Sequence, residues 1–391
     1  MGKLIEKLIN PFSYTSYIPE ITFITNLTAI SYAIPIKENS KNSKPRFSVI
    51  HTKSDWYFYF ASFTITLFYT GNYCYWFYTT IYNSPNNLQV WQVFMSIYFL
   101  FSYLIIFGMQ ATLLLRRSEF QFLLETLLWI EETCIKRGAS NYLQLKMLLS
   151  LTMAKFSLPT VSILMSLFGY FRPCAPPSVI AAFIFKCENG WVEDTLGVMQ
   201  RLFSGLCYAW VWYVLAAAVV VTMSVIVVYP AVMIELWMRC GEIQVRKSTR
   251  AVVDYRVGQV AQSLTNDVLS KPCLQLFLGL SIMAEISAMY VLTTSSRHLT
   301  VDAAMFFVLM GVDYFIIIHV VLRALSKSYV TSVKFIKNME RLHKRDPWFK
   351  RFLRSCPSLK VGMGDGKFFD GLTSFVIWQF CVDRLINLLL L

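Results

Sequence analysis

The sequence is poor in charged residues and lacks the short motifs that identify most enzymes. Asp, Glu, Lys and Arg make up 15% of its 391 residues, whereas a soluble domain carries about 25%. It contains no P-loop, GxGxxG, HExxH or GxSxG pattern, and its nine cysteines include no CxxC pair. We therefore expect neither an enzyme nor a cofactor, a metal site or a dense disulfide framework.

Long hydrophobic runs are abundant, because hydrophobic residues make up 56% of the chain and aromatic residues 16%. A helix that crosses a bilayer needs about 20 mostly apolar residues, and a backbone in hydrocarbon must satisfy its own hydrogen bonds. Seven runs meet this need: residues 56–81, 90–115, 149–171, 202–238, 273–294, 303–325 and 368–391. The sequence predicts an all-α polytopic membrane protein with seven transmembrane helices.

The runs divide the chain into four parts. Residues 1–55 are polar and basic, and their apolar patch, residues 21–36, is too short for a span and predicts an interfacial or re-entrant helix. Residues 56–326 hold the first six transmembrane helices and their loops. Residues 327–367 are expected to form an anchor helix and a linker, and residues 368–391 the seventh transmembrane helix.

Lys and Arg lie mainly on one side of the predicted membrane. Thirty of them are in the N-terminal segment and in the connections after runs 2, 4 and 6, and four are in the other connections. Basic loops stay in the cytoplasm, so we expect the N-terminus inside and, with seven spans, the C-terminus outside. The net charge of +13 is then a topology signal and a contact with lipid headgroups, and nucleic acid is not expected as a partner.

Three apolar segments extend past the predicted bilayer on the cytoplasmic side. The fourth run has about 36 apolar residues, which at 1.5 Å per residue exceeds the hydrocarbon core of about 30 Å. Its end, residues 229–237, together with residues 120–135 and 329–352, predicts a cytoplasmic bundle. An apolar surface of that size indicates subunit contacts.

The last run carries polar residues at bilayer depth. Gln379, Asp383 and Asn387 are spaced i, i+4, i+8 and therefore lie on one side of a helix. Polar groups at that depth usually face a bundle interior or a water-filled path. This pattern predicts a pore-lining stripe in which a ring of Asp383 carboxylates favours cations, with hydrogen bonds between helices as the alternative. Arg384 is expected to extend to the headgroups or to pair with a carboxylate.

Aromatic residues gather in the outer halves of the runs, where a ligand pocket and an interfacial belt explain them equally well. Two acidic residues inside runs are candidates for ligand or gating contacts, or for a hydrogen-bonded pair between helices. The pocket candidates are Trp91, Tyr98, Phe168, Tyr208, Trp212, Glu285, Tyr290, Phe306 and Asp313.

Two cysteines, Cys174 and Cys187, fall in the outer connection after run 3. Oxidation is possible outside the cell, so a disulfide between them is a candidate, with two free thiols as the alternative.

The end of the chain resembles the arthropod chemoreceptor superfamily, the gustatory and odorant receptors. The resemblance covers the seven-span plan and a terminal motif, of which this chain keeps Gly366, Phe368, Asp370, Leu372 and Ser374. Residues 346–360 also resemble the inner linker of that family. Where gustatory receptors have a Thr-Tyr pair and then Gln-Phe, this chain has Cys381-Val382 and Asn387-Leu388, so a divergent member is expected, closer to the gustatory type.

The resemblance implies a ligand-gated, non-selective cation channel in the plasma membrane of sensory neurons, expected in their dendrites. It implies a homo- or heterotetramer in which the last helix of each subunit lines the pore, with a hydrophobic gate from Val382, Leu385 or Leu389. The ligand would be a small tastant or odorant. The alternatives are an odorant-receptor-type subunit that needs a partner, and a secondary transporter that uses Glu285 and Asp313, although no internal repeat supports the latter.

Overall fold

Each of the seven predicted runs contains a helix, although the helix of the seventh run begins at Thr373 and not at Phe368, which belongs to a short strand. The computed structural model describes residues 16–38, 47–50, 52–83, 89–138, 145–175, 197–244, 248–269, 273–295, 299–343, 347–364 and 366–390. The runs correspond to α3 (Lys53–Asn83), α4 (Val90–Leu115), α6 (Leu145–Phe171), α7 (Val198–Val221) with η5 (Thr222–Val228) and α8 (Tyr229–Gln244), α10 (Cys273–Thr294), α11 (Val301–Ile316) with η6 (Ile317–Val321) and α12 (Leu322–Leu342), and α14 (Thr373–Leu389). The predicted all-α fold is confirmed.

Among the described residues, five helical segments are long and apolar enough to cross a membrane by length and composition. They correspond to runs 2 to 6; the fourth covers residues 198–242, four more at each end than the run, and the sixth continues from residue 303 to 342, well beyond the run. The other two runs are weaker signals. α3 is rich in Tyr and Trp, whose polar tips lower its hydropathy, and α14 has 17 residues and carries the polar stripe.

The remaining described elements are four further helices, two of which have 20 and 22 residues, and two small hairpins. The helices are α2 (Ile18–Ala29), α5 (Arg117–Lys136), α9 (Ser248–Leu269) and α13 (Pro347–Ser355). β1 (Ile36–Glu38) pairs antiparallel with β2 (Phe47–Val49), with Lys37 opposite Ser48. β3 (Gly362–Gly364) pairs antiparallel with β4 (Lys367–Phe368) just before α14, and Gly366 in this turn has φ +77°, a conformation that favours glycine.

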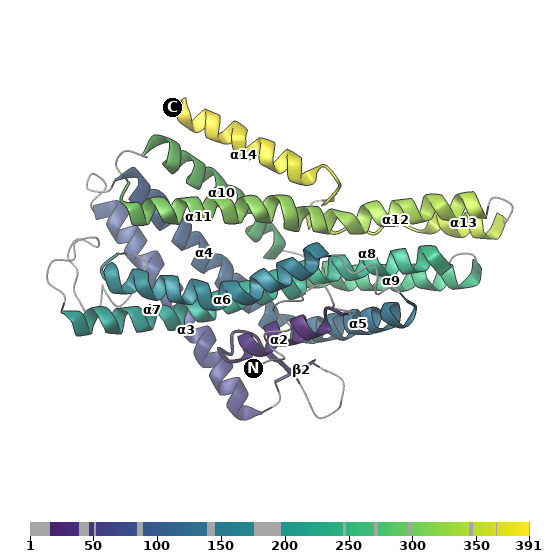
Figure 1. Ribbon diagram of the computed structural model, residues 1–391, viewed down its shortest axis with the longest axis horizontal. Helices are drawn as coiled ribbons and strands as arrows, with labels where there is room; N and C mark the ends of the chain where they lie inside the picture. The colour runs from purple at the N-terminus through teal and green to yellow at the C-terminus, as the bar shows by residue number, and fades with distance from the viewer. Residues whose placement is uncertain are drawn as a thin grey trace.

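Two regions follow one another along the length of the molecule (Figure 1). We call α3, α4, α6, α7, α10 and α11 the membrane bundle, and α5, α8, α9, α12 and α13 the distal bundle. Two long helices connect them, because α7 continues through η5 into α8 and α11 continues through η6 into α12. The apolar segments predicted to extend beyond the bilayer thus pack together in one bundle, which confirms that part of the predicted fold.

The distal bundle is held together by charged and aromatic side chains from several helices. Arg137, the residue after α5, pairs with Asp254 of α9 through two nitrogens, at 3.2 and 3.3 Å. Its guanidinium also lies 4.7 Å from the ring centroid of Trp237 on α8, whose Nε1 donates to the Asp254 carbonyl at 2.7 Å. These contacts fix α5, α8 and α9 relative to one another.

The predicted interfacial or re-entrant helix is α2, which packs against α6 and α7. Its N-terminus is held by the buried Glu131 of α5. The Glu131 Oε1 accepts the Ser16 hydroxyl at 2.6 Å and the Tyr17 N–H at 2.5 Å, and Oε2 accepts the Tyr229 hydroxyl of α8 at 2.7 Å. A carboxylate at a helix N-terminus also interacts favourably with the helix dipole. This residue therefore ties the start of the described chain to the distal bundle.

Close packing in the membrane bundle depends on glycine between α6 and α7. A Cβ on Gly169 would lie 2.7 Å from the Tyr208 ring, and one on Gly205 would lie 3.0 Å from the Ser166 carbonyl oxygen. At both positions a larger residue would clash with the neighbouring helix. Away from this seam, α6 exposes Ile163, Leu164 and Leu167, as expected of a face that meets lipid.

Candidate functional site

A cavity of about 210 Å³ lies in the membrane bundle, between α4, α6, α7, α10 and α11. Tyr98 and Trp212 supply aromatic surface, and Phe277 and Tyr314 add two more rings from α10 and α11. Asp313 is the one acidic residue of its lining. The cavity is small compared with the roughly 300–1,000 Å³ of common ligand pockets, which suits a compact organic molecule.

Polar atoms are few in this cavity, and two of them, the Ser102 Oγ and the Trp212 Nε1, have no hydrogen-bond partner among the described residues. The Trp212 Nε1 is buried and has no hydrogen-bond acceptor among the described residues. Buried indole N–H groups usually have a partner. An acceptor atom on a bound ligand would satisfy this donor, with the Tyr98 hydroxyl and the Asp313 carboxyl as further polar groups of the lining.

Three of the nine predicted pocket residues line this cavity: Tyr98, Trp212 and Asp313. Phe306 lies next to the lining, with its ring centroid 5.5 Å from that of Tyr98. Tyr290 packs on Phe94 at 5.1 Å. Phe306 thus contacts a residue of the cavity wall, whereas Tyr290 packs on Phe94, which is not part of the lining.

The other four predicted pocket residues lie elsewhere in the membrane bundle. Trp91 is buried near the start of α4, and its Nε1 donates to the Gln89 side chain at 2.5 Å. The Phe168 ring packs against Tyr208 with the ring centroids 6.3 Å apart, and the Tyr208 hydroxyl donates to the Ala175 carbonyl at 2.9 Å. Glu285 is buried on α10, close enough to α14 to interact electrostatically with Cys381.

Most of the aliphatic lining was not predicted from the sequence. It consists of Ile105, Ile106, Met109, Val161, Leu215, Ala216, Val219, Val220, Met223, Leu280 and Ile317. Along α4 the lining continues from Tyr98 to Met109, about 16 Å at 1.5 Å per residue, so the cavity extends toward the distal bundle. The spacing of Tyr98, Ser102, Ile105 and Met109, at i, i+4, i+7 and i+11, is the sequence signal that indicates one helix face.

The last helix packs on α10, α12 and η6 through one side only. Ser374, Ile377 and Cys381 of α14 are buried on that side. Gln379, Asp383 and Asn387 are exposed, as is Leu389, and Val382 and Leu385 are half-buried. Figure 1 shows α14 at the edge of the molecule. The predicted stripe thus lies on a face that the rest of this chain leaves uncovered.

An aromatic cluster joins the cavity to α14. Tyr314 and Ile317 line the cavity, and Phe315 and His319 on the same stretch contact Trp378 of α14, with ring centroids 5.0 and 5.5 Å apart. α11 and η6 therefore contact the cavity with some residues and α14 with others. Arg384, also on α14, lies over the Phe380 ring at 4.9 Å.

The disulfide prediction falls partly outside the described residues. Cys174 is disulfide-bonded, and Cys187 lies in a part of the chain that the structure does not describe. In the described ranges, no group of three or more His, Cys, Asp or Glu side chains is arranged to hold a metal ion.

Comparisons with known proteins agree with this architecture. No sequence profile of a known family and no curated protein matches the chain. The solved structure of the insect olfactory receptor OR5 from Machilis hrabei matches with a TM-score of 0.64 at 12% identity, covering 95% of this chain and 97% of that one. The same receptor in complex with eugenol matches with a TM-score of 0.67 at 13% identity, covering 94% and 97%.

The chain has the fold of an insect olfactory receptor. This fold extends over nearly the whole of both chains, so the predicted resemblance to the arthropod chemoreceptor superfamily is confirmed at the level of architecture. The matched structures are those of a receptor and not of an enzyme.

Proposed function

We propose that the protein is a chemosensory receptor that acts as a ligand-gated cation channel. The observation that carries the proposal is that α11 and η6 line the cavity on one side and contact α14 on the other. A ligand in the cavity would press on Tyr314 and Ile317, and the contact of Phe315 and His319 with Trp378 would transmit the displacement to α14. The olfactory receptor fold supports the same reading.

In this proposal four copies of α14 surround the pore. Its uncovered face carries Gln379, Asp383 and Asn387 at the centre and Leu389 toward the end. Asp383 carboxylates would attract cations, and Val382, Leu385 or Leu389 would close the pore. Basic loops would keep the N-terminus in the cytoplasm and the plasma membrane of a sensory neuron would hold the channel.

Subunit contacts in the distal bundle are also proposed, on α9. Val253 and Val260 are exposed, and Val257 and Leu264 are half-buried. Their spacing of four, three and four residues makes one apolar stripe along the helix, the pattern by which helices associate in water. A neighbouring subunit would cover this stripe.

The ligand would be a small tastant or odorant that reaches the cavity of about 210 Å³. OR5 was solved with eugenol, a compact aromatic molecule with polar oxygens. The terminal residues that this chain keeps favour a gustatory type, whereas the matched structures are olfactory. A ligand panel should therefore contain both volatile aromatics and soluble tastants.

The test is to express the chain alone in cells, screen this panel and record currents. Ligand-evoked cation current is expected, and Asp383→Lys should shift the reversal potential toward that of anions and lower cation permeability. Glu125→Lys, the same type of charge change at an exposed position of α5, is the control and should leave selectivity unchanged. Unaltered selectivity in Asp383→Lys would refute the pore assignment. Uptake without channel-sized current would refute the channel.

A further inference from the structure

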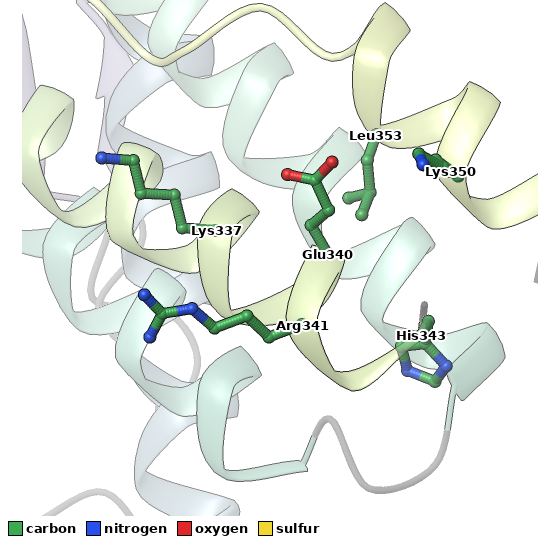
Figure 2. Close-up of a pocket in the computed structure, with 6 residues that line it drawn as sticks. All are labelled: Lys337, Glu340, Arg341, His343, Lys350 and Leu353. Atoms are coloured by element: carbon green, nitrogen blue, oxygen red, sulfur yellow. The ribbon is translucent and has the colours of Figure 1, made fainter. Parts of the chain in front are cut away.

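A second cavity, of about 510 Å³, lies at the far tip of the distal bundle. Its lining comes from the end of α12 and from α13: Lys337, Glu340, Arg341, His343, Lys350 and Leu353. Figure 2 shows Lys337 and Arg341 extending in the same direction from neighbouring turns of α12, away from α13, with Lys350 on α13 beyond Glu340 and Leu353. The cavity is thus bordered by cations from two helices.

The helical hairpin that forms this cavity is fixed by apolar contacts. Phe349 and Leu353 of α13 are buried, and the Phe349 ring lies 4.5 Å from that of His343. Lys337 and Arg341 are four residues apart, which places them on the same side of α12. The positions of the basic groups therefore follow from a packed core and not from a loop.

The positive charge around the cavity is not balanced within the described residues. None of Lys337, Arg341 and Lys350 lies within ion-pair distance of a carboxylate there, including that of Glu340. In the same helix Lys327 pairs with Glu235 at 3.5 Å and Lys334 with Glu242 at 3.9 Å. Like charges at i, i+4 repel each other, so an anion near Lys337 and Arg341 would remove an unfavourable interaction.

One buried polar atom at the cavity also lacks a partner. The Nε2 of His343 is buried and makes no hydrogen bond with the described part of the chain. An imidazole nitrogen can donate to an oxygen acceptor. A ligand rich in acceptor oxygens would satisfy this atom as well as the three cations.

The position of the cavity excludes the headgroups of the surrounding bilayer. Lys337 lies 12 residues beyond Leu325, the predicted end of the sixth run, which is about 18 Å along the helix. This distance is about twice the Debye length of 8 Å at physiological salt. The charges therefore act on solutes in water and not on the membrane surface.

We propose that this cavity binds a small soluble polyphosphate, such as an inositol polyphosphate or a nucleoside triphosphate. Arg341 would hold one phosphate with two parallel hydrogen bonds, Lys337 would act on the same group as a point charge, and Lys350 would hold another phosphate from α13. A volume of about 510 Å³ is in the usual range for ligands of this size. The bound ligand would clamp α13 to α12, at the start of the segment that leads to α14.

The experiment uses the full chain, purified in nanodiscs of phosphatidylcholine alone. Inositol hexakisphosphate is titrated at about 0.1 M salt, and its binding is followed by calorimetry and by the thermal unfolding midpoint. Saturable binding with one site per chain is expected, with a higher midpoint and with affinity that falls as salt is added. Lys337→Gln and Arg341→Gln should each weaken the binding tenfold or more.

Two further variants keep the test decisive. Glu340→Gln removes the carboxylate from the lining and should tighten binding severalfold, a gain that misfolding cannot produce. Lys334→Gln makes the same change of charge on α12 outside the lining and should alter affinity less than twofold. Equal losses in Lys334→Gln and Lys337→Gln, or absence of saturable binding, would overturn the site.

Two more titrations test whether the ligand is soluble or a lipid headgroup, and whether the site prefers phosphate to carboxylate. Nanodiscs that contain phosphatidylinositol bisphosphate should compete no better than those without it, and competition that depends on Lys337 would overturn the soluble source. Polyglutamate should bind at least tenfold more weakly than the polyphosphate. Equal affinity would overturn the assignment to phosphate.

Discussion

In the distal bundle the buried carboxylates of Asp254 and Glu235 have close cationic partners, whereas in the membrane bundle the buried carboxylate of Glu285 has none among the described residues. Asp254 meets Arg137, and Glu235 meets both Arg239 and Lys327. In the membrane bundle, Oε2 of Glu285 and Nε1 of Trp212 lack hydrogen-bond partners in the described ranges. Both regions bury large aromatic side chains, so the difference concerns polar groups and not apolar packing.

This difference fits the proposed function, in which the distal bundle is the fixed base of the channel and the membrane bundle responds to a ligand. A buried polar group without a hydrogen-bond partner lowers the stability of the fold by about 1–3 kcal/mol. Such groups are expected mainly at functional sites, where a ligand can supply the missing partner. The distal bundle satisfies its charges and can serve as the fixed base of an assembly. The membrane bundle keeps a cavity and polar atoms that a ligand can satisfy.

The largest effect is expected where the distal bundle is most tightly paired. Arg137→Ala leaves the Asp254 carboxylate, which is buried, without its cation and should lower the free energy of unfolding by about 3 kcal/mol. The adjacent Lys136 forms only an exposed pair with Glu132 at 4.0 Å, so Lys136→Ala should cost under about 0.5 kcal/mol. Thermal unfolding of both variants in the same detergent measures the difference. Similar midpoints would mean that the pairing is not what stabilises this region.

The next effect concerns Glu131, which ties the start of α2 to the distal bundle. Glu131→Ala removes the acceptor of the Tyr17 N–H and the Tyr229 hydroxyl and should cost about 2 kcal/mol. Glu131→Gln keeps the size of the side chain and is expected to be milder. Limited proteolysis near residues 16–18 should show faster cleavage in the alanine variant, because α2 loses its attachment. Unchanged cleavage would contradict this role.

Glu131 also gives a pH dependence with a definite sign. Burial raises the pKa of its carboxyl above the ordinary 4.5, although the hydrogen bonds it accepts act in the opposite direction. The folded state then binds the proton more tightly than the unfolded state, so the stability due to this group is fully present below pH 4.5 and decreases as pH rises through the raised pKa. The stability of the wild type relative to Glu131→Gln should therefore fall as the pH is raised. A difference that grows with pH would refute the assignment.

A smaller effect on stability but a clear effect on response is expected in the cavity. Ala216→Leu places a larger side chain in the lining, and should weaken ligand sensitivity about tenfold, equivalent to about 1.4 kcal/mol. Val308→Leu adds volume at an exposed position of α11 and serves as the control. Dose–response curves for the two variants decide the matter, because equal shifts would place the ligand elsewhere.

The smallest effect is expected at Glu285. Its Oε2 has no partner within the described chain, so Glu285→Gln removes no hydrogen bond there and should change the free energy of unfolding by less than about 0.5 kcal/mol. Thermal unfolding measures this directly. A loss of 2 kcal/mol or more would show that the membrane bundle relies on a buried charge as much as the distal bundle does, and would end the contrast between them.

Much of the fold follows from the sequence, because hydrophobic runs and the spacing of Gln379, Asp383 and Asn387 depend on helix periodicity alone. Those three residues share the uncovered side of α14, as their spacing predicts. The cavity lining was harder to predict, because it depends on how each helix is rotated. Tyr98 faces the cavity whereas Trp91, seven residues earlier on the same helix, packs near its start. The contact of His319 with Trp378 joins residues 59 positions apart, which no local pattern indicates.

The two π-helical turns have a mechanical consequence. η5 and η6 interrupt the two long helices where the membrane bundle meets the distal bundle. A π turn holds one residue more than an α turn, so its conversion to α geometry would rotate all that follows by about 100° and displace it by about 1.5 Å. Each long helix therefore has a position at which its membrane part could rotate relative to its distal part. The backbone hydrogen bonds of the helix would be rearranged there and not lost.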